Sequence, residues 1–287
     1  MRYTAAPALI DAFGSFAGSS RKDDEIDLTR AALLISRTRY PDLDIEAYAA
    51  RIDNLARRVA GLTPNHDGKE TISALNYVLF GELGLRGNRE DYYDPRNSFL
   101  NDVLDRGLGI PITLSVVYLE VANRIGFPMA GVGMPGHFLL KYRPSADSDG
   151  AHEILIDCFN QGDTLTPQDC QERLNEVYSG EMNLRPEFLH PVNRRQILAR
   201  MLNNLKTVYL STRDFRKALI IADLILVVRP RSAEDVKQRA LLRYSLEMHN
   251  LAAEDLEEYL RISPAAEDAK EVRQMSLSIR RMLAAMN

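Results

Sequence analysis

The chain has 287 residues, of which 45% are hydrophobic, and this suggests one large domain or two modest ones. Its only cysteines, Cys158 and Cys170, are too few for a disulfide framework or a four-cysteine zinc site, which fits a reducing compartment. A net charge of -4 argues against general nucleic-acid binding, because neutralising phosphates needs a concentrated basic face.

The chain also lacks the usual signals for export or membrane insertion. Its start, MRYTAAPALIDAF, runs into a polar segment without a long apolar region or a convincing cleavage site. No stretch approaches the roughly 18 consecutive apolar residues of a membrane span, and the longest candidate, 218–228, is interrupted by Asp223. We therefore expect a cytoplasmic protein that does not enter a membrane.

The first part of the chain predicts helices. Residues 27–60 mix apolar and charged residues at helical spacing, with one break around Pro41, and residues 69–80 form a third helical stretch. Candidate N-caps are Asp24 or Asp27 for the first helix and Asp44 for the second.

The middle of the chain predicts an α+β pattern. A short helix over 99–105 precedes GIPITLSVVYLEVANRIG, where Pro111 suits a first helical turn and a broad apolar stripe indicates a central buried helix. After Gly126 the periodicity favours antiparallel strands on either side of a polar loop at 145–150. A further helix is expected over 167–178.

The last third reads as all helical, and its landmarks recur every 34 residues, from Ala218 to Ala252 and from Pro230 to Pro264. This is the period of tetratricopeptide repeats. A first unit would contain Leu202, Leu205, Tyr209, Ala218, Ala222 and Pro230, and a second Ala240, Tyr244, Ala252, Leu256 and Pro264. Tyr244 stands one residue out of register from Tyr209, and a capping helix over 266–286 would complete the stack.

Three segments together resemble a known family: GIPITLSVVYLEVANRIGFP, GVGMPGHFLLKY and ILIDCFNQG. They are similar to the core of the bacterial SirB-one family, a branch of the transglutaminase-like superfamily, and the resemblance extends over nearly the whole chain. It implies a helical N-terminal region in 1–90, a transglutaminase-like (papain-like) core with an antiparallel sheet in 91–190, and tetratricopeptide repeats in 191–287.

The resemblance also implies a catalytic arrangement of Cys, His and Asp, in which His137 and Asp157 take the last two roles. Catalytic relatives place the nucleophilic Cys near the start of the central helix, where this chain has Pro111 to Ser115. Thr113 and Ser115 are weak nucleophile candidates, because an unactivated hydroxyl ionises far less than a thiol.

The cysteines do not readily replace this nucleophile. Cys158 directly follows Asp157, so on a regular strand its side chain points to the opposite face of the sheet, and we interpret it as a small buried residue. Cys170 lies in a predicted helix beyond the core and is interpreted in the same way.

A pocket is expected at the mouth of the central helix. Its candidate residues are Tyr92, Asp94, Arg96, Pro111 and Gly136. Loop packing explains such a polar and aromatic cluster equally well. The remaining histidines lack metal-ligand spacing and no phosphate-binding glycine loop occurs, so we expect neither a metal nor a cofactor.

Three functional hypotheses follow. The first is a pseudoenzyme that binds a protein or peptide partner or has a regulatory role, with the repeats offering a surface or packing on the core. The second is a hydrolase or acyl-transfer enzyme that uses His137 and Asp157 with an unrecognised nucleophile. The third is a core that serves only as a folding platform for the repeats.

Overall fold

The computed structural model describes residues 7–18, 21–63, 68–144 and 152–286, so the loop expected at 145–150 lies outside the described residues. The chain forms two compact units. One spans residues 23–201 and contains a five-stranded sheet, whereas the other joins residues 1–22 to residues 202–287 and is helical. The expected α+β fold class is confirmed.

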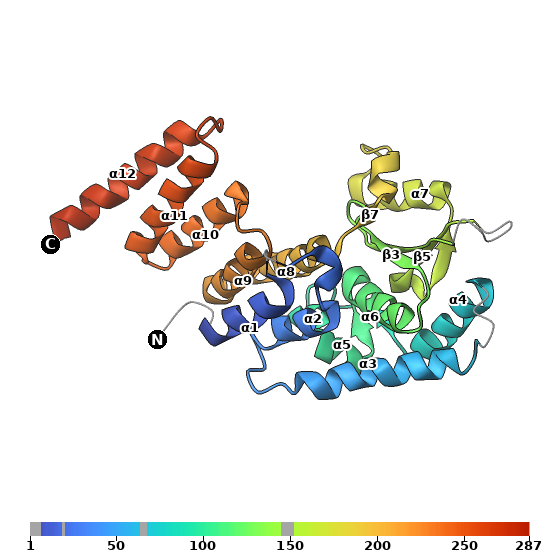
Figure 1. Ribbon diagram of the computed structural model, residues 1–287. Helices are drawn as coiled ribbons and strands as arrows, with labels where there is room; N and C mark the ends of the chain where they lie inside the picture. Colours follow the sequence, from blue (N-terminus) through green and yellow to red (C-terminus); the bar gives the residue numbers. More distant parts are fainter. Residues whose placement is uncertain (1–6, 19–20, 64–67, 145–151, 287) are drawn as a thin grey trace. The chain divides into compact units, whose positions relative to one another are not determined.

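The sheet of the 23–201 unit is antiparallel, with strand order β6-β5-β4-β3-β7. Its strands are β3 (Met129–Val132), β4 (Leu139–Tyr142), β5 (Ile154–Asp157), β6 (Asp163–Leu165) and β7 (Pro191–Val192). A separate parallel pair consists of β1 (Arg86–Gly87) and β2 (Leu108–Gly109). Helices α6 (Pro111–Arg124) and α7 (Pro167–Tyr178) cover opposite faces of the larger sheet (Figure 1).

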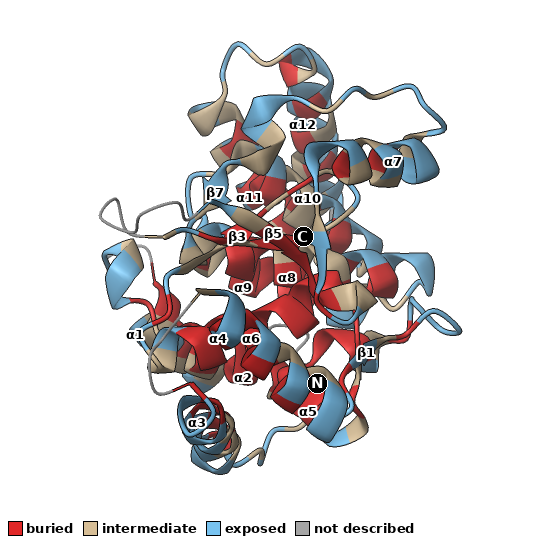
Figure 2. Ribbon diagram, turned by 90° about the vertical axis from the view of Figure 1, so that its right-hand side faces the viewer, coloured by how far each residue is buried: buried red, intermediate tan, exposed pale blue. Residues whose placement is uncertain are grey.

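Helix α6 is the centre of this unit. Pro111 occupies its first turn, and every residue from Pro111 to Ala122 is buried, as the red colouring in Figure 2 shows. A helix that is buried on all sides needs apolar residues around its whole circumference, which explains its broad apolar stripe. The predicted central helix is therefore confirmed.

Four further helical segments surround α6. They are α2 (Leu28–Ser36), α3 (Ile45–Ala60), α4 (Gly68–Asn76), which continues as a π-helical stretch over Tyr77–Glu82, and α5 (Leu100–Arg106). The side chain of Asp27 accepts a hydrogen bond from the backbone N–H of Arg30, and that of Asp44 accepts one from Ala47. Of the two candidates for the first cap, the structure selects Asp27, and it confirms Asp44.

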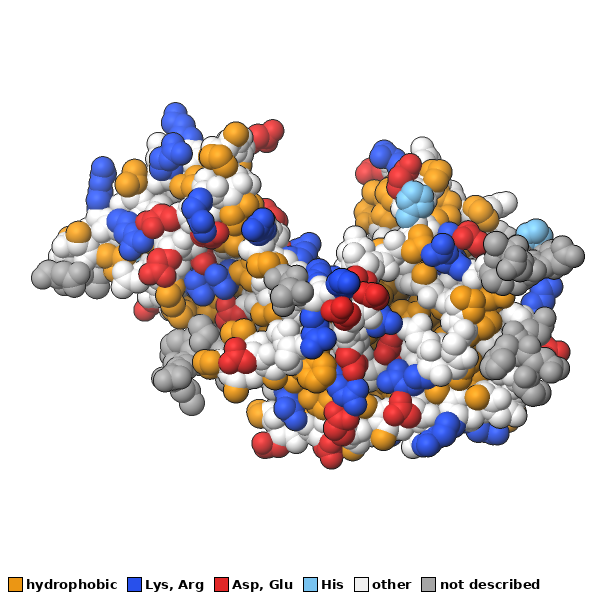
Figure 3. All heavy atoms as spheres, in the orientation of Figure 1, with side chains coloured by type: hydrophobic (Ala, Val, Ile, Leu, Met, Phe, Trp, Pro, Cys, Tyr) orange, Lys and Arg blue, Asp and Glu red, His pale blue; other side chains and the backbone are white. Residues whose placement is uncertain are grey.

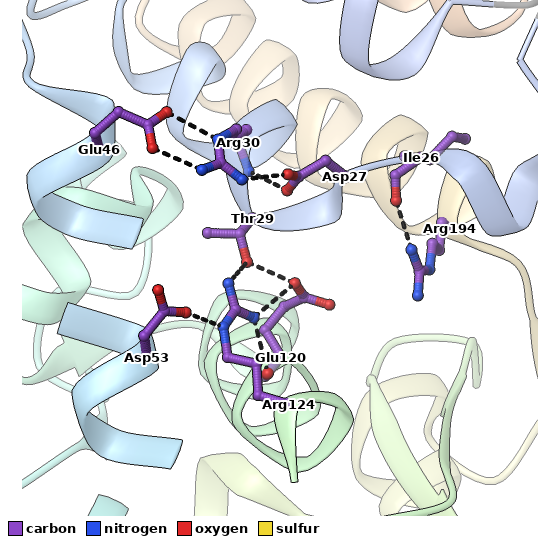
Figure 4. Close-up of polar contacts among 9 residues, drawn as sticks. All are labelled: Ile26, Asp27, Thr29, Arg30, Glu46, Asp53, Glu120, Arg124 and Arg194. Carbon is purple, nitrogen blue, oxygen red and sulfur yellow. Dashed lines mark hydrogen bonds and ion pairs between the residues drawn. The ribbon is translucent and has the colours of Figure 1, made fainter. Parts of the chain in front are cut away.

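A buried carboxylate connects three of these helices (Figure 4). Glu120 of α6 accepts hydrogen bonds from the hydroxyl of Thr29 in α2, at 2.5 Å, and from Arg124, at 3.1 Å. Arg124 in turn donates to Asp53 of α3 at 2.5 Å. Because Glu120 is only 6% exposed, these partners are needed to offset the cost of removing its charge from water.

The other unit consists of packed helices. They are α1 (Pro7–Ala17), α9 (Phe215–Val228), α10 (Ala233–Ser245), α11 (His249–Ile262) and α12 (Ala269–Met286), while α8 (Arg194–Ser211) crosses the boundary between the units. The sequence pattern placed the first residues in the 1–90 segment, whereas in the structure α1 contacts α9 and buries Phe13 and Ala17. In the sequence, this helix is indicated by the spacing of its apolar residues after Pro7.

The offset of Tyr244 has a structural consequence. Tyr209 is buried, and 34 residues later the equivalent position holds Arg243, which is also buried, so Tyr244 is rotated outward and 43% exposed. The guanidinium of Arg243 donates to Asp255 at 2.7 Å, and Arg239 bonds the same carboxylate at 2.7 Å. The second repeat thus contains an ionic network where the first has a buried tyrosine.

Charges are mixed on the surface. On the face drawn in Figure 3, Lys and Arg side chains are interspersed with Asp and Glu side chains. Within the described ranges, no helix is both long and apolar enough to cross a membrane.

We predict that Thr29→Val destabilises the protein by about 1.5–3 kcal/mol, because the buried Glu120 loses a hydrogen bond to a charged group. The measurement is the free energy of unfolding in urea, followed by circular dichroism. The matched control is Thr164→Val on the exposed edge strand β6, which should change this energy by less than about 0.5 kcal/mol. Equal effects of the two substitutions would contradict the anchoring role of Glu120.

Candidate functional site

His137 is presented by a tight turn before β4. Its backbone N–H donates to the carbonyl of Met134 at 3.1 Å, and Gly136 has a φ of +71°, which favours glycine. A Cβ atom at Gly136 would also lie only 2.7 Å from Val177 of α7. Glycine is therefore required here both by the backbone conformation and by the close approach of α7.

A half-buried arginine also holds this turn. Nη2 of Arg200, in α8, donates to the carbonyls of Met134, at 3.0 Å, and His137, at 2.6 Å, and the guanidinium lies over the ring of Phe138. Burial lowers the pKa of Arg200 from its ordinary value, although the nearby Tyr92 and Tyr178 act in the opposite direction. Arg200 therefore fixes the backbone on which His137 stands.

Asp157 ends β5 and is fully buried. Its Oδ1 accepts hydrogen bonds from the backbone N–H groups of Phe159, at 3.0 Å, and Asn160, at 3.3 Å, and its Oδ2 accepts one from the Asn160 side chain, at 2.6 Å. Burial alone would raise the pKa of Asp157, but His137, Asn160 and Arg173 outweigh it and lower the pKa below its usual value. Asp157 is thus held as a carboxylate.

The two side chains meet across neighbouring strands. Leu140 of β4 pairs with Ile156 of β5, so continuing this register places His137 and Asp157 as diagonal neighbours on one face of the sheet. Nε2 of His137 lies 2.9 Å from Oδ1 of Asp157, although the ring N–H is not directed squarely at that oxygen. The predicted pair is therefore close in space. Because Nε2 makes this contact, Nδ1 is the ring nitrogen that remains for another partner.

The hydroxyls near the start of α6 are buried and do not line the pocket in front of His137. Thr113 is fully buried, and its hydroxyl donates to the carbonyl of Asn97 at 2.7 Å and accepts from the backbone N–H of Ile110 at 3.1 Å. Ser115 is also fully buried and lies beside the thiol of Cys158. Among the described residues around His137, the side chain that α6 contributes to the pocket is that of Pro111.

Both cysteines are buried, as their interpretation from the sequence predicts. Burial raises the pKa of the Cys158 thiol well above its ordinary value, and Ser115 only partly offsets this. Burial also raises the pKa of Cys170 to about 11, and its side chain packs in the cluster between the sheet and α7. Neither thiol has the depressed pKa of an activated nucleophile.

A pocket of about 360 Å³ opens in front of His137. Its described lining combines aromatic, basic and small side chains: Arg89, Tyr92, Tyr93, Pro111, Gly136, His137, Phe159, Asn160, Arg173, Glu176 and Val177. Its volume is within the range of small-ligand sites. Three of the residues predicted for a pocket at the start of the central helix, Tyr92, Pro111 and Gly136, lie together here.

Asp94 and Arg96 do not line this pocket. Asp94 caps a short 3-10 helix over Pro95–Ser98 by accepting from the backbone N–H of Arg96 at 2.9 Å. Its carboxylate also bonds the side chain of Arg96 and lies 3.3 Å from that of Arg106. The local cap and these two arginines direct Asp94 away from His137.

Helix α7 contributes pocket residues that sequence reasoning missed. Arg173, Glu176 and Val177 are three and four residues apart, so they share one face of α7. The spacing was visible in the sequence, but nothing there indicated that this face turns toward His137. Across the described ranges, no group of three His, Cys, Asp or Glu side chains is placed to hold a metal ion.

Comparisons with known proteins show which families the chain matches. A family model described as transglutaminase-like superfamily matches residues 46–203, and a tetratricopeptide-repeat model matches residues 205–276. A UPF0162 protein of Xylella fastidiosa is 36% identical over 255 residues, covering 88% of this chain and 89% of its own. Protein SirB1 of Salmonella typhimurium is 25% identical, covering 68% and 71% respectively. Human F-box only protein 21 is 35% identical over 139 residues, covering 47% of this chain and 21% of its own.

We predict that Asp157→Asn lowers the free energy of unfolding by about 1–3 kcal/mol at pH 7, because the carboxylate loses charge-assisted hydrogen bonds. A carboxyl whose pKa is lowered by folding stabilises the protein above its unfolded pKa and loses that effect as the pH falls through its folded pKa. The stability difference between wild type and Asp157→Asn should therefore shrink as the pH falls below about 5.

The measurement is urea unfolding at pH 7 and at successively lower pH values at which both proteins remain folded. Asp163→Asn, at an exposed position on the neighbouring strand, is the matched control and should show a small difference at every pH. A constant difference for Asp157→Asn would show that the ionised state of Asp157 does not stabilise the fold.

We also predict that neither cysteine reacts with Ellman's reagent at pH 8 in the folded protein, because both thiols are buried and their pKa values are raised. Both should react once the chain is unfolded in urea, which supplies the internal control. Rapid reaction of one thiol in the folded protein would identify an accessible nucleophile and contradict this prediction.

Proposed function

Since the chain belongs to the transglutaminase-like superfamily, we propose that its core is a non-catalytic module that binds a polypeptide in the pocket in front of His137. The observation that carries this proposal is which residue of α6 lines the pocket together with His137. Pro111, which has neither a thiol nor a hydroxyl, occupies the start of α6 where catalytic relatives are expected to place their cysteine.

The surroundings of His137 support binding without chemistry. The two hydroxyls of the first turns of α6 are buried, and Thr113 is committed to backbone hydrogen bonds. The thiol of Cys158 is buried and its pKa is raised. A nucleophile must be activated and accessible to the substrate, and none of these three groups lines the pocket in front of His137.

The rim of the pocket supports a polypeptide partner. Among the described residues of the 23–201 unit, five large hydrophobic side chains are exposed: Leu62, Tyr77, Tyr92, Tyr93 and Val177. Three of them line this one pocket, with Tyr93 67% and Val177 52% exposed. Exposed aromatic and aliphatic groups that gather around a concave site are typical of binding surfaces.

The repeats are consistent with the same role. Tetratricopeptide repeats are stacked helical units that commonly present binding surfaces, and the family match covers residues 205–276. We propose that they also take part in binding a protein or peptide partner.

A second candidate function rests on the contact between His137 and Asp157. A histidine oriented by a buried carboxylate is the arrangement of a general base, so a hydrolase or acyl-transfer enzyme with an unrecognised nucleophile is the alternative. That alternative requires a substrate that the protein chemically alters and predicts that His137→Ala abolishes the reaction without unfolding the protein.

The test is retention of a randomised mixture of hexapeptides, acetylated and amidated at their ends, on the immobilised full chain. We expect Tyr93→Ala to reduce the retained fraction by about tenfold, which corresponds to the loss of about 1.4 kcal/mol of binding energy. Tyr77→Ala, which removes an equally exposed ring away from the pocket, should leave retention unchanged.

Mass spectrometry of the recovered peptides separates the two functions. Unaltered masses are expected for a binding module. Cleaved or deamidated peptides that disappear with His137→Ala would establish the enzyme instead, and equal retention by wild type and Tyr93→Ala would overturn the proposed binding pocket.

A further inference from the structure

We propose that the pocket recognises an Asp or Glu side chain within an extended peptide, and that Arg89 is the residue that binds its carboxylate. This inference rests on the proposed function, because it names the chemical group that the pocket in front of His137 accepts.

Arg89 is a charged group with only neutral partners in the described part of the chain. Its guanidinium contacts the side-chain oxygen of Asn160 and lies over the ring of Phe159, 5.3 Å from the centroid. Neither an amide nor a ring neutralises a cation, and a guanidinium carries five N–H donors. Stacking on Phe159 fixes the plane of Arg89 and leaves further donors for a ligand, so part of the entropy cost of binding is already met.

The second arginine of the pocket is only loosely paired. Nε of Arg173 lies 3.7 Å from Asp157, and its Nη1 lies 3.6 Å from Glu176, both beyond ordinary hydrogen-bonding distance. This Nε is also buried without a hydrogen-bond partner among the described residues. The shared carboxylate of Asp157 is already committed to His137 and Asn160.

A third cation adds to the positive charge of this region. Among the described residues, the guanidinium of Arg200 donates to two carbonyl oxygens, those of Met134 and His137, and not to a carboxylate. Arg89 and Arg173 line the pocket together with the carboxylate of Glu176, and Arg173 also interacts with Asp157 and Asp169. These carboxylates lie beside Arg173, so a ligand carboxylate would pair with Arg89 through charge-assisted hydrogen bonds.

The surface next to the pocket favours a side chain over a chain terminus. A neighbouring hollow of about 350 Å³ shares Arg173 and Glu176 with the pocket, so a bound peptide has room to continue beyond it. That hollow is also lined by Asp163, Asp169 and Glu172. The negative charge of this hollow repels a carboxylate, so the acidic residue of the ligand is expected at Arg89. The part of the peptide that lies in the hollow is expected to carry basic residues.

The experiment uses three hexapeptide mixtures on the immobilised full chain. The first has both ends blocked and Glu fixed at the third position, the second is identical except for Gln at that position, and the third has a free C-terminus and no acidic residue. We expect wild type to retain the Glu mixture about tenfold more than the Gln mixture, because only Glu forms charge-assisted bonds with Arg89.

Arg89→Gln should remove this preference, and Arg86→Gln, an exposed arginine three residues earlier outside the pocket, should preserve it. Equal retention of the Glu and Gln mixtures by wild type, with retention still dependent on Tyr93, would overturn the carboxylate inference and leave the proposed function intact. No retention of any mixture would overturn both.

Two other results would also overturn the assignment. Preferential retention of the mixture with the free C-terminus would show that the pocket binds a terminal carboxylate rather than a side chain. A Glu preference that survives Arg89→Gln would assign the carboxylate to a residue other than Arg89.

Discussion

The burial of α6 from Pro111 to Ala122 is the constraint on which the 23–201 unit depends. A carboxylate on a buried helix needs partners within the protein, and Glu120 finds them in Thr29 and Arg124. Those bonds fix α6 against α2, and Arg124 extends the connection to α3 through Asp53. The position of Pro111 at the mouth of the pocket is a consequence, because the same rigid helix begins there.

Asp157, which contacts His137, also has a structural role. Asp157 caps the turn after β5 by accepting backbone hydrogen bonds, so this carboxylate is needed whether or not the histidine acts as a base. Arg200 and Gly136 shape the turn that carries His137. The position of Asp157 beside His137 therefore has a structural reason that does not depend on any catalytic role.

The two repeats show a comparable substitution of one interaction by another. A one-residue offset turns Tyr244 outward and places Arg243 inside, where it shares Asp255 with Arg239. Buried ion pairs add little net stability compared with apolar packing, but removing one partner is costly. This network therefore constrains which substitutions the second repeat tolerates more than it increases its stability.

By itself, the sequence determined the fold class, the central helix, the strands on either side of the polar loop and the 34-residue repeat, because these follow from local periodicity and turn residues. It also identified His137, Asp157 and Pro111, through a family resemblance carried by contiguous motifs. Only the tertiary structure decided three other features. Arg173 and Val177 line the pocket with His137, Arg200 binds the turn that carries His137, and Asp94 pairs with arginines outside the pocket. These contacts join residues distant in the chain or depend on which face of a helix turns inward, and no local pattern specifies either.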